Sequence, residues 1–223
     1  MTVWPGRLVP LAPDAEGLAL AVAALESGSV VGVPTDTVYG LAVDPTHPGA
    51  VDQLFALKQR PTDVALPVLV DGPEHLSLVA GSLDSAARHL AERYWPGPLT
   101  LVVPRRRGFT VDLGGPRSSG QTVGVRWPDH DLVRRLCRSL GPLAVTSANL
   151  HGARPATSAQ QVADAFEGSG ALAVVLDGGR CEGIPSTVVE CRGPAFRCLR
   201  EGAIPWADLH GRDQPRPTPR TDR

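Results

Sequence analysis

Lysine is almost absent from this chain of 223 residues. Of its 22 lysine and arginine residues, only Lys58 is a lysine. Codon usage that favours arginine would explain the bias by itself, with Lys58 as a chance survivor. The alternative interpretation is that position 58 needs a compact ammonium group, which a planar guanidinium does not replace. The motif around Lys58, described below, favours this second interpretation.

Long apolar runs, paired cysteines and excess basic charge are also missing. No charge-free apolar run reaches the roughly 18 residues of a membrane span, and residues 1–10 lack the apolar core of a signal peptide. We therefore expect a cytoplasmic protein without membrane contact. The four cysteines form no C-x-x-C pair, which predicts reduced thiols and no metal site. A formal net charge of -1 argues against a general nucleic-acid binder.

The common nucleotide and hydrolase signatures are absent as well. The chain contains no G-x-x-x-x-G-K-[ST], no G-x-G-x-x-G after a strand, no H-E-x-x-H and no G-x-S-x-G. These absences remove the support for a P-loop enzyme, a dinucleotide-binding domain, a zinc peptidase or an α/β-hydrolase.

Strand-like apolar runs alternate with helical ones through most of the sequence, which predicts an α/β domain. Several strands follow each other without a helix between them, so we expect a twisted mixed sheet flanked by helices. Helices are predicted at 14–25, 48–58, 83–94, 131–140 and 159–166. Strands are predicted at 29–34, 66–70, 99–103, 122–127, 143–146, 172–176, 187–191 and 196–199.

The pattern indicates one domain with short extensions. We expect a lead-in over residues 1–14 and a catalytic domain over 15–205. Residues 206–223 interleave prolines with arginines, cannot bury a core, and are predicted to form a flexible tail.

Polar segments follow several predicted strands, which is where α/β proteins tend to bind ligands. Residues 34–40 directly follow the apolar run at 30–33. Lys58 and Arg60 end a helix. A basic pair there is more often a complement to the helix dipole than a site, but an ammonium and a guanidinium also suit phosphate or carboxylate oxygens.

Three further clusters have both a structural and a functional interpretation. Residues 146–149 carry hydroxyl and amide groups that either bind phosphate or sugar or satisfy a turn. In the strand at 122–127, alternation places Thr122 and Arg126 on one face, where Arg126 is a site cation or a surface charge. The glycine-rich segments between 178 and 202 permit close approach to a ligand, although such segments are usually only turns. We interpret residues 105–107, three arginines, as a solvated loop.

In this order and spacing, the clusters resemble one family, the YrdC-like L-threonylcarbamoyl-AMP synthases. The resemblance covers nearly everything from about residue 15 to 205, and eight ordered matches are far more specific than any one alone. The matching segments are PTDTVYGL (34–41), LFALKQRP (54–61), LPVLV (66–70), YWPGPLTLVV (94–103), TVGVRWP (122–128), TSAN (146–149), PSTVV (185–189) and LREGAI (199–204).

The resemblance implies a YrdC-like fold with a concave basic face that binds ATP and threonine. The signature residues of the family, implied to be catalytic, correspond to Lys58, Arg60, Ser147 and Asn149. ATP contacts are implied for Lys58, Arg60, Thr122, Ser147 and Arg200. Threonine contacts are implied for Thr37, Arg126 and Ser186.

The implied reaction joins L-threonine, bicarbonate and ATP into L-threonylcarbamoyl-AMP, pyrophosphate and water. The adenylate serves threonylcarbamoyladenosine modification of tRNA, with Mg²⁺ on the phosphates of ATP. The chain ends soon after Arg200 and therefore resembles the short, single-domain form, which leaves transfer to separate tRNA threonylcarbamoyl transferase proteins. Weak contact with RNA is a further expectation.

Three positions depart from the pattern of the family. Val64 and Pro155 stand where members often carry polar residues near ATP, and Leu69 stands where some have a threonine-contacting histidine. These departures leave open whether threonine is the sole amino-acid substrate. Two alternatives therefore remain: a paralogue that uses another carbamate or carbamoyl-AMP, and an RNA-binding module without catalysis.

Overall fold

The computed structural model of the chain describes residues 8–59, 63–115 and 121–210. Its strands form one mixed sheet in the order β7-β1-β2-β6-β3-β5-β4-β8-β9. The strands are β1 (Val30–Val33), β2 (Gly40–Val43), β3 (Val68–Leu69), β4 (Leu99–Pro104), β5 (Thr122–Arg126), β6 (Leu143–Ser147), β7 (Leu172–Val175), β8 (Thr187–Arg192) and β9 (Ala195–Arg200).

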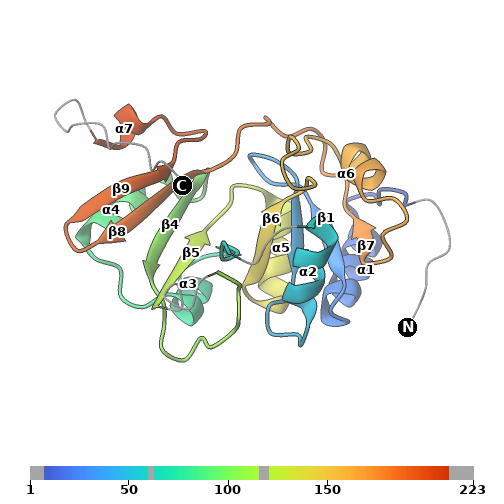
Figure 1. The fold of residues 1–223 in the computed structure, drawn as a ribbon, viewed down its shortest axis with the longest axis horizontal. Helices are drawn as coiled ribbons and strands as arrows, with labels where there is room; N and C mark the ends of the chain where they lie inside the picture. The colour runs from blue at the N-terminus through green and yellow to red at the C-terminus, as the bar shows by residue number, and fades with distance from the viewer. Residues whose placement is uncertain (1–7, 60–62, 116–120, 211–223) are drawn as a thin grey trace.

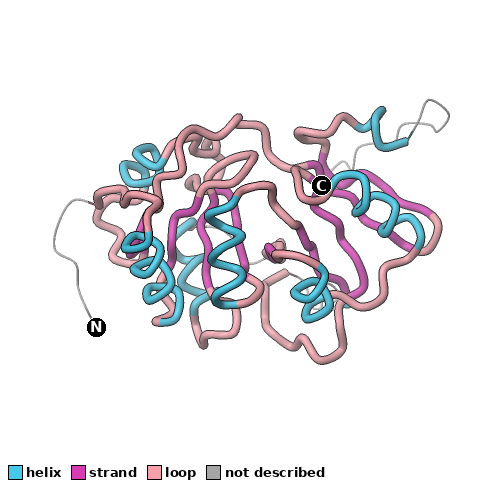
Figure 2. The backbone as a smooth tube through the Cα atoms, turned by 180° about the vertical axis from the view of Figure 1, so that it is seen from behind, coloured by secondary structure: helices cyan, strands magenta, loops and turns pink. Residues whose placement is uncertain are grey.

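The helices lie over two halves of this sheet (Figure 1). The helices are α1 (Ala15–Glu26), α2 (Ala50–Lys58), α3 (Pro73–Val79), α4 (Ser85–Tyr94), α5 (Asp131–Leu140), α6 (Ala159–Ala165) and α7 (Trp206–His210). Contacts join α1, α2 and α6 to the half that contains β1, while α4 contacts β4, β8 and β9. Figure 2 shows the same two groups of helices from behind.

The sheet is mixed, as predicted. β1 runs antiparallel to β2 but parallel to β7, and β4 runs antiparallel to β5 but parallel to β8. The order of the strands places β6, β3 and β5 side by side although they lie far apart in the sequence. Loops that end at this central part of the sheet can therefore combine residues from distant segments.

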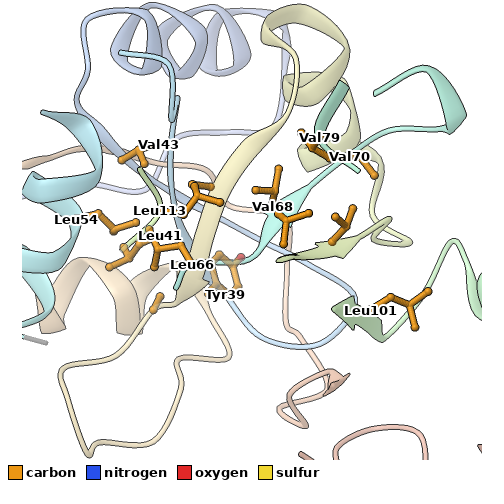
Figure 3. Close-up of a cluster of buried hydrophobic side chains, with 14 of the residues drawn as sticks. Tyr39, Leu41, Val43, Leu54, Leu66, Val68, Val70, Val79, Leu101 and Leu113 are labelled. Carbon is orange, nitrogen blue, oxygen red and sulfur yellow. The ribbon is translucent and has the colours of Figure 1, made fainter. Parts of the chain in front are cut away.

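Apolar side chains pack on both faces of the sheet, which explains the continuous apolar runs in strands such as β1. Val30 belongs to one cluster together with Leu54 of α2, and its neighbour Val31 belongs to a second cluster with Leu25 of α1 and Leu136 of α5. Figure 3 shows part of the first cluster, in which Leu54 lies beside Leu41 and Val43 of β2.

The predicted helices and strands are present, with three additions, β2, α3 and α7. The four residues of β2 were not predicted because they are a short continuation of a polar segment. The seven residues of α3 begin at Pro73, a favoured first helical position, but form too short a helix for a clear period. Helix α1 begins as predicted, because the side chain of Asp14 accepts a hydrogen bond from Gly17 N at 2.9 Å.

Residues 206–210 differ from the prediction of a flexible tail. Residues 206–210 form α7, and Trp206, only 6% exposed, packs its ring edge-on against Phe196 with centroids 5.9 Å apart. The predicted start of the tail at residue 206 is therefore too early. Trp206 and Leu209 are both buried, and these two apolar side chains hold α7 against the core. Residues 211–223 lie outside the described part of the chain.

None of the described helices combines the length and the apolar character needed to cross a membrane.

Asp71, directly after β3, joins several elements through its carboxylate. It accepts hydrogen bonds from Trp127 Nε1 at 3.1 Å, from Arg134 Nε at 2.6 Å and from Arg138. Burial alone would raise the pKa of Asp71, but the two arginines outweigh burial and hold the pKa below its ordinary value. The carboxylate thus ties the ends of β3 and β5 to α5.

We expect Asp71→Asn to lower the free energy of unfolding by about 1–3 kcal/mol at neutral pH, because hydrogen bonds to charged groups contribute on that order. A carboxylate whose pKa is depressed in the folded state stabilises the protein above its unfolded pKa, and this contribution is lost as the pH falls through the folded pKa. The difference between wild type and variant in urea denaturation should therefore shrink on acidification. Glu92→Gln, at an exposed position on α4, is the control. A difference that stays constant with pH would contradict this account.

Candidate functional site

Arg126, at the end of β5, is the centre of one cluster of predicted site residues. Its side chain is nearly buried, with 6% exposed, and donates three hydrogen bonds. Nε donates to the carbonyl of Gly97 at 3.1 Å, Nη1 to Thr37 Oγ1 at 2.8 Å and Nη2 to Asp36 Oδ1 at 2.5 Å. Burial lowers the pKa of Arg126, and the charge of Asp36 opposes this shift. The guanidinium is thus held in one orientation.

Arg200 and Ser186 extend this cluster. Arg200 Nη2 donates to the carbonyl of Ser186 at 2.8 Å and to Ser186 Oγ at 3.2 Å. The same hydroxyl lies 2.9 Å from Thr100 Oγ1 on β4. The charge of Arg200 acts on Arg126 and lowers its pKa further. Two guanidinium groups therefore lie near each other with hydroxyl groups around them.

Gly202 allows the chain to cross this part of the cluster closely. A Cβ atom at position 202 would lie 2.2 Å from the carbonyl oxygen of Pro185 and 2.6 Å from that of Ser186. Only a residue without a side chain fits there, which explains the glycine two positions after Arg200.

Lys58 forms a second cluster with Ser147, the last residue of β6, and Asn149, which follows this strand. Its side chain is 3% exposed, and Nζ donates to the carbonyl of Ser147 at 2.5 Å and to Asn149 Oδ1 at 3.3 Å. Ser147 Oγ donates to the same Asn149 oxygen at 2.6 Å, and Asn149 Nδ2 donates to the carbonyls of Leu150 and Ala153. The ammonium at the end of α2 is therefore fixed against the loop after β6.

The segment 35–40 lies between the two clusters. On one side, Thr37 and Asp36 bond to Arg126. On the other side, β2 pairs Gly40 with Ser147, and Ala148 N donates to the carbonyl of Tyr39 at 2.7 Å. A Cβ atom at position 40 would lie 2.6 Å from Val145 Cγ1, so a glycine is needed for this close pairing. This segment therefore brings the cations of both clusters to one region.

A connection from β7 to β8 crosses over the segment 35–37. Cys181 Sγ donates to the carbonyl of Thr35 at 3.1 Å, and Gly183 N donates to the carbonyl of Thr37 at 2.8 Å. Tyr39 anchors the start of this connection, because its hydroxyl donates to the carbonyl of Gly179 at 2.8 Å and accepts from Gly178 N at 3.2 Å. Burial raises the pKa of Tyr39 to about 12, so the hydroxyl stays protonated.

The structure does not place two of the predicted residues in these clusters, one of them because it is not described. Arg60 lies outside the described residues. Thr122 begins β5 and lies on the same face as Arg126, but four residues away, which is about 13 Å along a strand. The structure therefore brings together Thr37, Arg126, Ser186 and Arg200 in one cluster and Lys58, Ser147 and Asn149 in the other.

Four contributors were not singled out from the sequence. Asp36 and Thr35 lie inside a motif that was quoted, but neither received a role. Thr100 is a polar residue on an apolar strand, and Cys181 lies in a glycine-rich segment that resembles an ordinary turn. For Thr100 a signal was available in the sequence, because a threonine inside the otherwise apolar run at 99–103 is expected to be buried. A buried hydroxyl group in turn needs a hydrogen-bond partner.

The three departures from the family pattern lie in different environments. Leu69 pairs in register with Arg126 and packs in an apolar cluster with residues of α5, whereas Val64 is exposed and Pro155 is half-buried. Leu69 is thus the departure that lies beside the Arg126 cluster.

The basic run at 105–107 follows β4 and makes hydrogen bonds to neighbouring segments. Arg105 donates to the carbonyls of Phe109 and Val111, and Arg106 Nη1 donates to the carbonyl of Ser77 at 2.9 Å. The three arginines, Phe109 and Gln121 line a cavity of about 570 Å³. Arg106 and Arg107 are exposed, in agreement with a solvated loop, whereas Arg105 is half-buried.

The cysteines are all free, as predicted. Burial raises the pKa of Cys137 and of Cys191 to about 12, which makes these thiols poor nucleophiles. Within residues 8–59, 63–115 and 121–210, no group of three histidine, cysteine or acidic side chains is placed to hold a metal ion.

The sequence model of the Sua5/YciO/YrdC family, described as "Telomere recombination", matches residues 23–202. The chain belongs to this family. A family member from Pyrococcus abyssi (strain GE5 / Orsay), named threonylcarbamoyl-AMP synthase, is 35% identical over 85% of this chain and 55% of its own length. A second, from Mycobacterium tuberculosis (strain CDC 1551 / Oshkosh), is named putative threonylcarbamoyl-AMP synthase and is 36% identical over 84% of this chain and 85% of its own length.

The fold agrees with solved structures of the Sua5/YciO/YrdC family. The P. abyssi Sua5 crystal structure, described as complexed with L-threonine, superposes with a TM-score of 0.79 at 33% identity, and covers 92% of this chain and 61% of that one. The chain therefore spans little more than half of the P. abyssi relative, but most of the M. tuberculosis relative.

Proposed function

We propose that this protein is an L-threonylcarbamoyl-AMP synthase, a nucleotidyltransferase that converts L-threonine, bicarbonate and ATP into L-threonylcarbamoyl-AMP, pyrophosphate and water. The observation that carries the proposal is the convergence of Lys58, Arg126 and Arg200 around the segment 35–40. The 33% identity to a structure with bound L-threonine supports the choice of amino acid.

The Arg126 cluster suits the amino-acid substrate. A guanidinium has five N–H groups, and three of those on Arg126 bond to oxygens of the described residues. One N–H on each terminal nitrogen is left, and this pair matches the two oxygens of a carboxylate. Arg126 therefore binds the threonine carboxylate, while the hydroxyl groups of Thr37 and Ser186 orient the substrate beside it.

The Lys58 cluster suits the phosphates of ATP. The carbonyl of Ser147 and the amide of Asn149 fix Nζ in place, so that its charge needs no reorganisation when a phosphate arrives. Ser147 and Asn149 position the phosphates with Lys58, Arg200 contributes a second cation, and Arg60 and Thr122 complete the set of nucleotide contacts. Mg²⁺ enters with ATP as part of the substrate, because it prefers phosphate oxygens and water to an all-protein site.

The chemistry requires two anions to meet. The threonine amine, after losing a proton, attacks carbon dioxide derived from bicarbonate, and forms a carbamate. A carbamate oxygen then attacks the α-phosphorus of ATP, while the bond from that phosphorus to the bridging oxygen breaks and pyrophosphate leaves. Two negatively charged reactants repel each other at short distance. The clustered cations offset this repulsion and stabilise the leaving pyrophosphate.

The product is a reactive adenylate. Separate proteins use it as their substrate when they transfer the threonylcarbamoyl group to tRNA. Such a handover takes place in the cytoplasm, where tRNA modification substrates are found. Weak contact with the RNA itself fits the cavity at 105–107, where Arg105 lies over the ring of Phe109 and further arginines line the wall.

The paralogue alternative predicts different chemistry at the same site. An enzyme that handles carbamoyl-AMP or another carbamate would consume ATP without threonine. An RNA-binding module would bind RNA without ATP and form no adenylate. The ordered Lys58 cluster argues against the latter, because a general RNA surface does not need a buried ammonium.

The test uses purified protein with labelled bicarbonate, MgATP and each amino acid in turn. We expect a labelled adenylate only in the reaction that contains L-threonine, and none with the other amino acids. Label incorporated without threonine would favour the paralogue, and the absence of any labelled adenylate in the presence of RNA binding would favour the RNA module.

A further inference from the structure

Thr100, on β4, places a buried hydroxyl group beside the Arg126 cluster. The residue is 4% exposed and stands between the buried Leu99 and Leu101. In the pairing of β4 with β5, Leu101 lies opposite Val125. The next position of this antiparallel register brings Thr100 across from Arg126, and residues opposite each other share one face of a sheet. The side chain of Thr100 therefore lies on the same face as that of Arg126.

The hydroxyl of Thr100 has a single partner among the described residues. Its Oγ1 lies 2.9 Å from Ser186 Oγ, and either atom can be the donor. Ser186 Oγ also accepts a hydrogen bond from Arg200 Nη2 at 3.2 Å. A hydroxyl group donates one hydrogen bond and accepts two. The direction of the bond between Thr100 and Ser186 therefore determines which hydroxyl keeps a proton that it can give to a ligand.

The position of Thr100 inside the sheet decides this direction. If Ser186 donated, the proton of Thr100 would be enclosed without an acceptor, and a buried unsatisfied donor destabilises a protein. Thr100 therefore donates to Ser186. Ser186 lies just outside β8, next to the cations of the Arg126 cluster, where an oxygen of a bound anion supplies an acceptor. Because Thr100 and Arg200 occupy both acceptor positions of Ser186 Oγ, the O–H group of Ser186 points in the one direction that is left.

We propose that Thr100 is a positioning residue that acts through Ser186. By giving its proton to Ser186, Thr100 directs the O–H group of Ser186 at an oxygen of the amino-acid substrate held by Arg126. A hydroxyl group that is oriented before the substrate arrives loses little freedom on binding, which increases the affinity. This inference rests on the proposed function in one respect, namely that the ligand at Arg126 is L-threonine.

The contacts of Arg200 make the expected effect specific for one substrate. Arg200 Nε and Nη2 donate to the carbonyl of Ser186 at 3.2 Å and 2.8 Å, and these bonds do not use the hydroxyl of Ser186. Removal of the Thr100 hydroxyl therefore leaves Arg200, the proposed ATP contact, in place. The loss should raise the KM for L-threonine and spare the KM for ATP.

The first test is the steady-state kinetics of pyrophosphate release by Thr100→Val, with L-threonine and MgATP varied in turn. Valine replaces Oγ1 with a methyl group and keeps the methyl group that faces Gly124. We expect the KM for L-threonine to rise on the order of fivefold, which corresponds to one neutral hydrogen bond, and the KM for ATP to stay within about twofold. Thr100→Ser, which keeps the hydroxyl, should restore the wild-type values. Thr46→Val, at an exposed threonine before α2, is the matched control and should behave like the wild type.

A double-mutant cycle with Ser186→Ala separates this role from a merely structural one. If Thr100 acts only through Ser186, Thr100→Val should add nothing to the rise in the KM for L-threonine that Ser186→Ala causes. Urea denaturation verifies that each variant is folded. Should Thr100→Val not fold, Thr100→Ala removes the same hydroxyl without adding an atom and takes its place in the cycle.

The outcomes distinguish the inference from the proposed function. An unchanged KM for L-threonine in the folded variant, an equal rise in both KM values, or effects that add in the cycle would overturn the role of Thr100 and leave the proposed function intact. A wild-type protein that forms no adenylate with L-threonine would instead overturn the proposed function.

Discussion

Lys58→Ala should lower the rate of pyrophosphate release on the order of a hundredfold or more, which is the usual cost of removing one group that stabilises charge in a transition state. The ammonium is held by Ser147 and Asn149, and the rest of the chain offers no other lysine to replace it. Lys58→Arg should rescue little activity, because a planar guanidinium does not fit a site shaped for a compact ammonium.

One control for this prediction is chemical modification of the single lysine, and another is a variant of an exposed arginine. Because Lys58 is the only lysine, an amine-specific reagent modifies one side chain apart from the N-terminal amine. Saturating MgATP should protect that side chain from modification. Arg93→Ala, at an exposed position on α4, should leave activity close to that of the wild type. Nearly unchanged pyrophosphate release by a folded Lys58→Ala protein would contradict the assignment.

Arg126→Lys should raise the KM for L-threonine roughly 30-fold or more and change the KM for ATP much less. The variant keeps a positive charge opposite Asp36 but loses the two parallel N–H groups that match a carboxylate. Hydrogen bonds to charged groups contribute about 1.5–3 kcal/mol each, which corresponds to at least tenfold in affinity.

The conservative change is needed here because Arg126 is nearly buried. Arg126→Leu would leave Asp36 without its ion-pair partner, and such a loss destabilises proteins by roughly 3–5 kcal/mol. Steady-state kinetics with each substrate varied in turn separate the two KM values, and urea denaturation verifies that Arg126→Lys is folded. An equal rise in both KM values, or no rise, would argue that Arg126 does not hold threonine.

The sequence predicted the local elements well because each is encoded by short-range signals. Asp14 caps α1 as expected, and the continuous apolar run of β1 reflects helices on both faces of the sheet. α7 was missed because its burial depends on Trp206 docking against Phe196, a contact between segments that composition alone does not pair. Proline and arginine content nearby predicted a tail where an apolar helix begins.

The site was predicted in part for the same reason. Motif order grouped Lys58 with Ser147 and Asn149, and the structure places these residues in contact. Asp36 received no role because its partner Arg126 lies 90 residues away in sequence. Their pairing depends on the order of strands in the sheet, and alternating apolar patterns do not determine that order.

The central claim is that clustered cations around the segment 35–40 bring the carbamate of threonine to the α-phosphorus of ATP. A crystal structure with L-threonine and a non-hydrolysable ATP analogue tests it most directly. We predict phosphate oxygens within hydrogen-bond distance of Lys58 Nζ and the threonine carboxylate on the guanidinium of Arg126. A triphosphate bound away from Lys58, with threonine on other residues, would contradict the account.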